Sequence, residues 1–165
     1  MANGPLQLRF VQSASDVGQL PDSQREVALV GRSNVGKSSL LNAVANSTKL
    51  AKTSKTPGAT RLLNAFEVAG GTPGRWIVDL PGYGFAKVAK HERNRWATMI
   101  GAYLHDRPSL ATVLLLVDGE IGPTKLDLQT WDYLAEVGRP IRVVATKADK
   151  VKATARDRRK RDLAA

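Results

Sequence analysis

The positions of apolar and polar residues along the chain alternate between two periods, which predicts strands and helices in turn. Short apolar, β-branched runs predict strands at residues 25–30, 61–68, 75–79, 111–118 and 141–146. Helical spacing of apolar residues predicts helices at 37–45 and 91–104, and a third that begins after a capping Thr124. Its inward face is expected to hold Leu128, Trp131, Leu134 and Ala135. The alternation favours an α/β fold with a mostly parallel sheet and one antiparallel hairpin strand.

Turn-forming residues predict how these elements are connected and where the domain begins and ends. Glycines and a proline at 70–74 predict a hairpin, and residues 46–59 and 80–89 are predicted as loops. The first 24 residues are expected to form an N-terminal extension, residues 25–150 one domain, and residues 151–165 a basic tail that starts a further helix. The tryptophans fall at positions typical of core packing, namely Trp76, Trp96 and Trp131.

Composition narrows the class of protein. The chain has 165 residues, of which 42% are hydrophobic and 24% charged, as in an ordinary globular domain. It has no cysteine, which excludes disulfides, thiol catalysis and cysteine-based zinc sites. No apolar run is long enough to span a membrane and no signal peptide is evident, so we expect a cytoplasmic protein with no membrane partner. The net charge of +10 suggests a polyanionic partner, of which nucleic acid is the commonest.

The segment between the first predicted strand and helix matches the phosphate-binding pattern G-x-x-x-x-G-K-[ST]. Glycines let the backbone wrap around a phosphate, and successive N–H groups point inward at a helix N-terminus. The lysine would reach the β- and γ-phosphates of a nucleoside triphosphate, and the serine hydroxyl would bind Mg²⁺. The alternative is a glycine-rich turn that only starts a helix. The residues of this loop are Gly31, Arg32, Ser33, Asn34, Val35, Gly36, Lys37 and Ser38.

A D-x-x-G pattern follows the strand at residues 75–79. An aspartate at a strand end can hold Mg²⁺ through water, and a glycine N–H can meet the γ-phosphate. The pattern alone is weak, because a Pro-Gly turn has the same residues, but its order after the phosphate loop favours the functional interpretation. Its residues are Asp79, Leu80, Pro81 and Gly82.

A third pattern, [NT]-K-x-D, ends the strand at residues 141–146 and consists of Thr146, Lys147, Ala148 and Asp149. The Asp149 carboxylate can accept hydrogen bonds from guanine N1–H and the 2-amino group, whereas adenine has neither donor. Lys147 would lay its aliphatic stem along the base. A solvated turn would have the same residues, but as the third motif in order they favour GTP over ATP.

Together these motifs resemble the EngB family of bacterial GTPases. The resemblance rests on residues 31–43, 52–68, 79–88 and 146–150 and covers the chain from about Val27 to about Lys150. It implies a three-layer, Ras-like P-loop fold with two switch loops and GTP hydrolysis to GDP. It also implies a role in assembly of the large ribosomal subunit, contact with rRNA, an indirect link to cell division and septation, and a monomer.

The resemblance also implies roles for individual residues. Thr60 matches the switch I threonine, which with Ser38 and Asp79 would form the Mg²⁺ site. Asn34 matches an asparagine that in related GTPases helps to bind K⁺, which can replace an arginine finger. The expected catalytic residues are therefore Lys37, Asn34, Thr60 and Gly82. The switch I segment lining the nucleotide comprises Gly58, Ala59, Thr60, Arg61 and Leu62.

Three departures from the family pattern limit these expectations. Tyr83 stands where Ras-type enzymes carry the glutamine that positions water, which predicts slow intrinsic hydrolysis. Ala59 stands where a lysine or arginine is usual. Family members normally continue through a further helix, a last strand with a guanine-contacting loop and a final helix, so this chain is either a fragment or a short homologue. Its last sixteen residues carry a net charge of +5, as the solvated face of a helix or as an rRNA-binding arm.

Two alternatives to a GTPase switch remain open from the sequence. The first is a nucleotide-sensing, RNA-binding module with negligible hydrolysis, which the Tyr83 position and the +10 charge support. The second is a P-loop ATPase, which Asp149 argues against. Affinities for GDP and ADP distinguish the second alternative, and hydrolysis with and without ribosomal subunits distinguishes the first.

Overall fold

The computed structural model, which describes residues 4–47, 50, 62–84 and 90–164, contains a six-stranded sheet with the order β1-β3-β4-β2-β5-β6. Strands β2, β4, β5 and β6 are parallel, and β3 pairs antiparallel with both β1 and β4. The predicted mostly parallel sheet with one antiparallel strand is therefore confirmed. The strands are β1 (Gln7–Ala14), β2 (Arg25–Gly31), β3 (Leu63–Ala69), β4 (Arg75–Asp79), β5 (Leu110–Asp118) and β6 (Ile141–Thr146).

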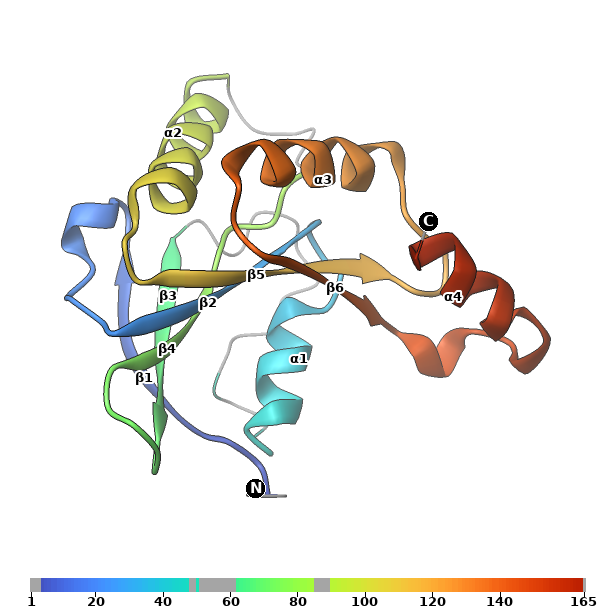
Figure 1. Cartoon of the computed structure of the whole chain (residues 1–165), viewed down its shortest axis with the longest axis horizontal. Helices are drawn as coiled ribbons and strands as arrows, with labels where there is room; N and C mark the ends of the chain where they lie inside the picture. The colour runs from blue at the N-terminus through green and yellow to red at the C-terminus, as the bar shows by residue number, and fades with distance from the viewer. Residues whose placement is uncertain (1–3, 48–49, 51–61, 85–89, 165) are drawn as a thin grey trace.

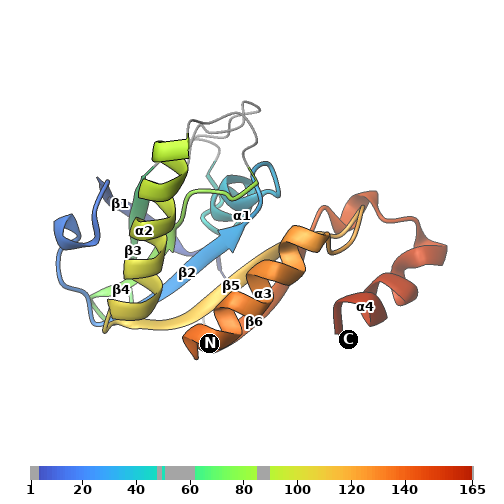
Figure 2. The same cartoon turned by 90° about the horizontal axis from the view of Figure 1, so that it is seen from above.

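Helices cover both faces of this sheet and make a three-layer structure (Figures 1 and 2). Helices α2 (Lys90–Asp106) and α3 (Lys125–Val137) lie on one face, and α1 (Lys37–Val44) lies on the other. Successive residues of β2 serve the two cores: Ala28 and Val30 face the α2/α3 side, whereas Leu29 packs with Leu41 of α1. Helix α4 (Arg156–Ala164) lies beyond the ends of β5 and β6, after short 3₁₀ turns at Ala148–Lys150 and Ala153–Ala155. In the described part of the chain, no helix combines the length and the apolar character that crossing a bilayer requires.

Strand β1 was not predicted from the sequence, which treated the first 24 residues as an extension. Its residues pair with β3 from Gln7–Ala69 to Ala14–Leu63, with an irregularity between Phe10 and Gln12. Most of the strand is partly or fully exposed, and of its residues Ala14 is buried. An edge strand of this kind has no clear alternation of apolar and polar residues, because one ladder rather than burial holds it in place.

Helix α3 begins as predicted but faces the sheet differently. The Thr124 side chain accepts a hydrogen bond from the Asp127 backbone, and the Asp127 side chain accepts one from the Thr124 backbone, which makes a capping box. Leu134 is fully buried, as expected. The prediction that Leu128, Trp131 and Ala135 face inward is wrong, because all three are exposed, Trp131 by 41%. Trp76 is buried as predicted, and the side chain of Trp96 lies outside the described residues.

A buried cluster of charged and polar residues joins β2 to the end of α2. The Glu26 carboxylate is fully buried and accepts hydrogen bonds from Arg107 (2.7 Å), Tyr103 (2.7 Å) and Ser23 (2.6 Å). Burial alone would raise the pKa of Glu26, but the hydrogen bonds from Arg107, Ser23 and Tyr103 outweigh it and lower the pKa below 4.5. This network anchors the strand that leads into the candidate site.

We expect the Glu26→Gln variant to unfold with a free energy about 3 kcal/mol below that of the wild type at pH 7, because it leaves Arg107 buried without its counter-charge. The wild-type advantage should shrink as the pH falls below 4.5, because the carboxylate of the unfolded chain is then protonated before the more acidic carboxylate of the folded state. Urea unfolding at pH 7 and pH 4 measures both effects. Glu136→Gln, at an exposed position of α3, is the control and should change stability by less than about 0.5 kcal/mol. A Glu26→Gln deficit that is independent of pH would contradict this explanation.

Candidate nucleotide-binding site

The glycine-rich segment lies between β2 and α1, at the carboxyl edge of the parallel strands, where ligands of open α/β sheets bind. Gly36 immediately precedes α1 with a φ of +112°, a left-handed conformation that other residues rarely adopt. Asn34 is also left-handed, with a φ of +61°, which asparagine tolerates better than most residues. The chain therefore curves around the N-terminus of α1, as a loop that presents N–H groups to an anion must.

Lys37 and Asp79 are two buried side chains of opposite charge beside this loop. Lys37 is 8% exposed and its Nζ donates to the Gly31 carbonyl at 3.4 Å. Asp79, at the end of β4, is 2% exposed, and its Oδ1 is buried without a hydrogen-bond partner among the described residues. Burial lowers the pKa of Lys37 and raises that of Asp79 to about 6, while their mutual attraction opposes both shifts. A buried acceptor beside a buried cation suits a ligand that brings both negative charge and a hydrated metal.

The D-x-x-G segment lies directly against the phosphate loop. The backbone N–H of Ser33 donates to the Tyr83 carbonyl at 3.0 Å, and the Tyr83 N–H donates to the Gly31 carbonyl at 3.3 Å. A Cβ at Gly82 would lie 2.9 Å from the Ser33 nitrogen and 3.1 Å from Lys37 Nζ, so a side chain does not fit there. Only glycine permits this approach, which places the Gly82 backbone next to the lysine ammonium.

The T-K-x-D segment follows β6 and is tied to the same loop. The Thr146 hydroxyl donates to the Val35 carbonyl at 2.6 Å, and the Thr146 side chain lies against Gly36. Lys147 has a φ of +53°, and its Nζ contacts Asp118 at 2.5 Å. Asp149 lies in the exposed 3₁₀ turn that follows. The structure thus brings three motifs that are far apart in sequence to one edge of the sheet.

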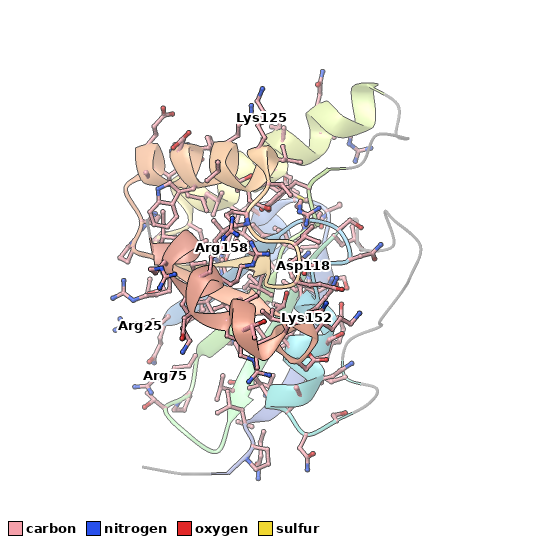
Figure 3. All side chains as sticks on the ribbon, turned by 90° about the vertical axis from the view of Figure 1, so that its right-hand side faces the viewer. Arg25, Arg75, Asp118, Lys125, Lys152 and Arg158 are labelled. Atoms are coloured by element: carbon pink, nitrogen blue, oxygen red, sulfur yellow. The ribbon has the colours of Figure 1, made fainter. Side chains whose placement is uncertain are left out.

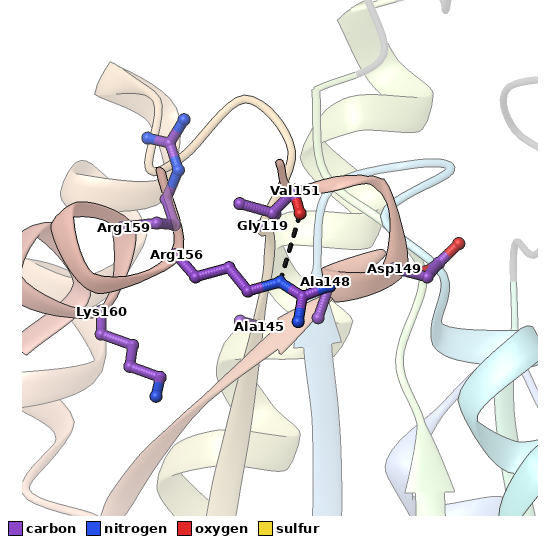
Figure 4. A pocket seen from close by; sticks show the side chains of 8 residues that line it. All are labelled: Gly119, Ala145, Ala148, Asp149, Val151, Arg156, Arg159 and Lys160. Atoms are coloured by element: carbon purple, nitrogen blue, oxygen red, sulfur yellow. Dashed lines mark hydrogen bonds between the residues drawn. The ribbon is translucent and has the colours of Figure 1, made fainter. Parts of the chain in front are cut away.

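A cavity of about 450 Å³ lies behind this turn, between the ends of β5 and β6 and helix α4. Arg156 donates from Nε to the Val151 carbonyl at 3.3 Å at its wall (Figure 4). The Asp149 side chain points away from Arg156, Arg159 and Lys160, so its carboxylate is directed away from these cations (Figure 4). The cavity is lined by Gly119, Ala145, Ala148, Asp149, Val151, Arg156, Arg159 and Lys160.

Four residues of the expected switch I segment, 58–61, lie outside the described residues. These include Thr60, the expected third member of a Mg²⁺ site. Leu62, the last residue of that segment, is 38% exposed and immediately precedes β3. Ser38, the second residue of α1, and Asp79 are the members of the expected metal site that the structure describes. No cluster of three or more acidic, histidine or cysteine side chains that could hold a metal exists among these described parts of the chain.

Sequence reasoning missed two acidic residues next to the site. Asp118 ends β5, and its contact with Lys147 holds the T-K-x-D lysine (Asp118 is labelled in Figure 3). Burial alone would raise the pKa of Asp118, but the hydrogen bond from Lys147 outweighs it and lowers the pKa. Asp127, in the first turn of α3, accepts a hydrogen bond from the Tyr83 hydroxyl at 2.7 Å. Asp118 could have been found from the sequence, because it is an aspartate at the end of a buried strand. Asp127 could not, because its position is already explained by helix capping.

A glycine-rich loop between a buried strand and a helix, a D-x-x-G segment against it and a T-K-x-D segment bound to it define a P-loop nucleotide-binding domain of the GTPase class. The sequence matches the family described as 50S ribosome-binding GTPase over residues 26–147. Probable GTP-binding protein EngB of Koribacter versatilis is 49% identical over 149 residues, which cover 87% of this chain and 72% of that protein. The EngB protein of Bordetella pertussis is 48% identical over 147 residues, covering 86% and 71%.

Solved structures agree with this result. A crystal structure of a probable GTP-binding protein EngB superposes with a TM-score of 0.65 at 28% identity, covering 84% of this chain and 78% of that one. The GTPase Era of Aquifex aeolicus, at 24% identity and a TM-score of 0.67, shares the fold. The chain therefore belongs to the EngB family of GTP-binding proteins.

Proposed function

We propose that this chain binds GTP with Mg²⁺, hydrolyses it to GDP and phosphate, and acts as a nucleotide-controlled switch in assembly of the large ribosomal subunit. The observation that carries the proposal is the meeting of three motifs at one edge of the sheet, around the buried Lys37 and the Asp79 Oδ1, which has no hydrogen-bond partner in the described part of the chain. We further propose that it acts as a cytoplasmic monomer, with any link to cell division arising indirectly.

The loop backbone and Lys37 would bind the phosphates of the nucleotide. Ser38 and Thr60 would supply hydroxyl ligands to Mg²⁺. Asp79 would hold one of its waters through Oδ1, which no described residue satisfies. When bound, Mg²⁺ neutralises charge on the β- and γ-phosphates. The Gly82 N–H would meet the γ-phosphate, because its backbone lies beside Lys37 Nζ.

The base of the nucleotide would be bound by four residues, namely Thr146, Lys147, Ala148 and Asp149. Lys147 is held by Asp118 through its ammonium, which leaves its aliphatic stem to cover the base. The exposed Asp149 carboxylate would accept from guanine N1–H and the 2-amino group. We infer guanine specificity from these donors and acceptors.

The chemistry of hydrolysis would rest on positioning and charge neutralisation by Lys37, Asn34, Thr60 and Gly82. Tyr83 cannot replace a water-positioning glutamine, since its hydroxyl already donates to Asp127. Asn34, left-handed at the centre of the loop, would help to bind K⁺ in place of an arginine finger. Slow hydrolysis by the isolated chain follows, with activation by an ion or a partner surface.

Charge supports a ribosomal partner. The segment 150–161 carries seven lysines and arginines, and the described side chains of α4 are largely exposed. Lys152 and Arg158 lie on this side of the molecule (Figure 3). Such a surface can bind rRNA phosphates, which would make the contact salt-dependent.

The test is GTP hydrolysis by the purified chain in KCl, alone and with large ribosomal subunits, with ATP as the control substrate. We expect slow GTP turnover that rises at least about tenfold with subunits, and no ATP turnover, because the base site selects guanine. Replacing K⁺ by Na⁺ should lower the rate if Asn34 binds K⁺. Fast turnover that ribosomal particles leave unchanged would contradict the switch. Guanine binding without hydrolysis in any condition would favour a nucleotide-sensing RNA-binding module.

A further inference from the structure

Asp127 joins three parts of the molecule that meet beside the phosphate loop. It is 1% exposed and lies in the first turn of α3. One carboxylate oxygen, Oδ1, accepts from the Tyr83 hydroxyl at 2.7 Å. The other, Oδ2, accepts from the Thr124 N–H at 2.8 Å and hydroxyl at 2.7 Å, and it lies 3.4 Å from Arg32 Nε. A capping box alone needs only the contacts with Thr124, so the contacts with Tyr83 and Arg32 call for a separate explanation.

Tyr83 connects Asp127 to the phosphate loop, because its side chain bonds to Asp127 and its backbone bonds to the loop. Its N–H and C=O both bond to the loop, at Gly31 and Ser33, in a parallel bridge opposite Arg32. Burial and the bond to Asp127 both raise the pKa of the Tyr83 phenol, so the hydroxyl stays protonated as a donor. Side chain and backbone of one residue therefore hold the D-x-x-G segment from two sides.

Gly82 is the residue whose position this arrangement controls. It directly precedes Tyr83, and its backbone approaches Ser33 and Lys37 Nζ closely enough to exclude a Cβ. A group beside the Lys37 ammonium is where the terminal phosphate of a triphosphate would be met. A diphosphate has a β-phosphate for Lys37 but no γ-phosphate for the Gly82 N–H.

The geometry points to Asp127 as a positioning residue that, by holding the Tyr83 hydroxyl, seats the Gly82 backbone beside Lys37 and so favours GTP over GDP. This inference rests on the proposed function and adds to it the element, the first turn of α3, that sets the discrimination between the two nucleotides. Conversely, a partner that moves α3 would change the nucleotide preference, because binding and positioning are linked.

The decisive variant is Tyr83→Phe, which removes the hydroxyl and keeps the ring, the backbone and the capping box. We expect its Kd for a hydrolysis-resistant GTP analogue to rise about tenfold, since a hydrogen bond to a buried carboxylate is lost. Its Kd for GDP should change by less than about twofold. Asp127→Asn should show the same selective loss, and the double variant should be no worse than the single ones because both act on one contact. Fluorescent forms of the two nucleotides measure these affinities for the wild type and the three variants.

Two controls separate positioning from mere stability. Tyr133→Phe removes a hydroxyl from an exposed tyrosine on α3 and should leave both affinities unchanged. Thr124→Val removes the capping hydroxyl and keeps the Tyr83–Asp127 contact, so it should lower the melting temperature without changing the ratio of the two affinities. An equal loss of affinity for both nucleotides in Tyr83→Phe, or a lower Kd for the GTP analogue, would overturn the inference. A wild-type chain that binds neither nucleotide would overturn the proposed function as well, whereas wild-type binding with an unchanged ratio in the variants would overturn the inference alone.

Discussion

Replacing Lys37 with alanine is expected to weaken binding of both GTP and GDP by at least about a hundredfold, which corresponds to about 3 kcal/mol. The Lys37 ammonium is buried, and the hydrogen bond that the structure shows for it, to the Gly31 carbonyl, is long at 3.4 Å. Most of its hydrogen-bonding capacity is therefore available to phosphate oxygens, and in a buried position a charge-assisted bond is strong. Titration with fluorescent GDP and with a fluorescent GTP analogue measures the loss.

The control for this variant is Lys125→Ala, at the exposed first residue of α3 (labelled in Figure 3). It removes the same charge from the chain and should leave both affinities within about twofold, since screened surface charge contributes little. Circular dichroism of the Lys37→Ala protein confirms that it is folded. Unchanged GDP affinity in a folded Lys37→Ala protein would contradict the placement of phosphates at this loop.

Asp149→Asn is expected to reverse the base preference of the site. An asparagine can present its amide N–H groups to the base, where the guanine N1–H and 2-amino group need an acceptor, so GDP affinity should fall at least about a hundredfold. Xanthine carries a carbonyl oxygen in place of the 2-amino group, so xanthosine diphosphate should bind the variant better than the wild type does. ADP should bind the wild-type protein at least about a hundredfold more weakly than GDP.

The matched control is Asp132→Asn, on the exposed surface of α3, which should leave all three affinities unchanged. Competition of GDP, ADP and xanthosine diphosphate against one fluorescent nucleotide gives the three values in a single experiment. A variant that keeps the GDP affinity of the wild type would count against Asp149 as the base-reading residue. Equal wild-type affinity for ADP and GDP would return the P-loop ATPase to consideration.

The sequence predicted the elements that frame the site because each is specified locally. Strand β2 contains a short apolar run, α1 starts at a glycine-rich loop, and the capping residue of α3 is recognisable as Thr124. The inward face of α3 was mispredicted because a charged residue occupies it. Asp127 lies seven residues before the buried Leu134 and on the same face of the helix. One of its hydrogen-bond partners is Tyr83, which is 44 residues away in sequence. Hydrophobic periodicity takes no account of such a partner.

The candidate site also has features that the sequence predicted and features that it did not. The three motifs were found by pattern, since the spacing of glycines, lysine and aspartates is fixed by the phosphates and base they would bind. The contacts between motifs could not be found, because they depend on tertiary packing: Thr146 with Val35, Lys147 with Asp118, and Tyr83 with Asp127. Strand β1 was missed because backbone pairing with β3 holds it, and its residues show little alternation of apolar and polar positions.

The hydrogen bond between the Thr146 hydroxyl and the Val35 carbonyl joins the T-K-x-D segment to the phosphate loop, so the proposed base and phosphate sites are connected directly. A nucleotide that fits these connected sites need not bring them together when it binds, so little of its interaction energy is spent on ordering the protein. The same connection limits how nucleotide can leave. We expect release to begin at other segments of the proposed site, among them the D-x-x-G segment held by Tyr83, because the base and phosphate sites are tied to each other. On the proposed function, we therefore expect a partner that contacts α3 to control nucleotide exchange.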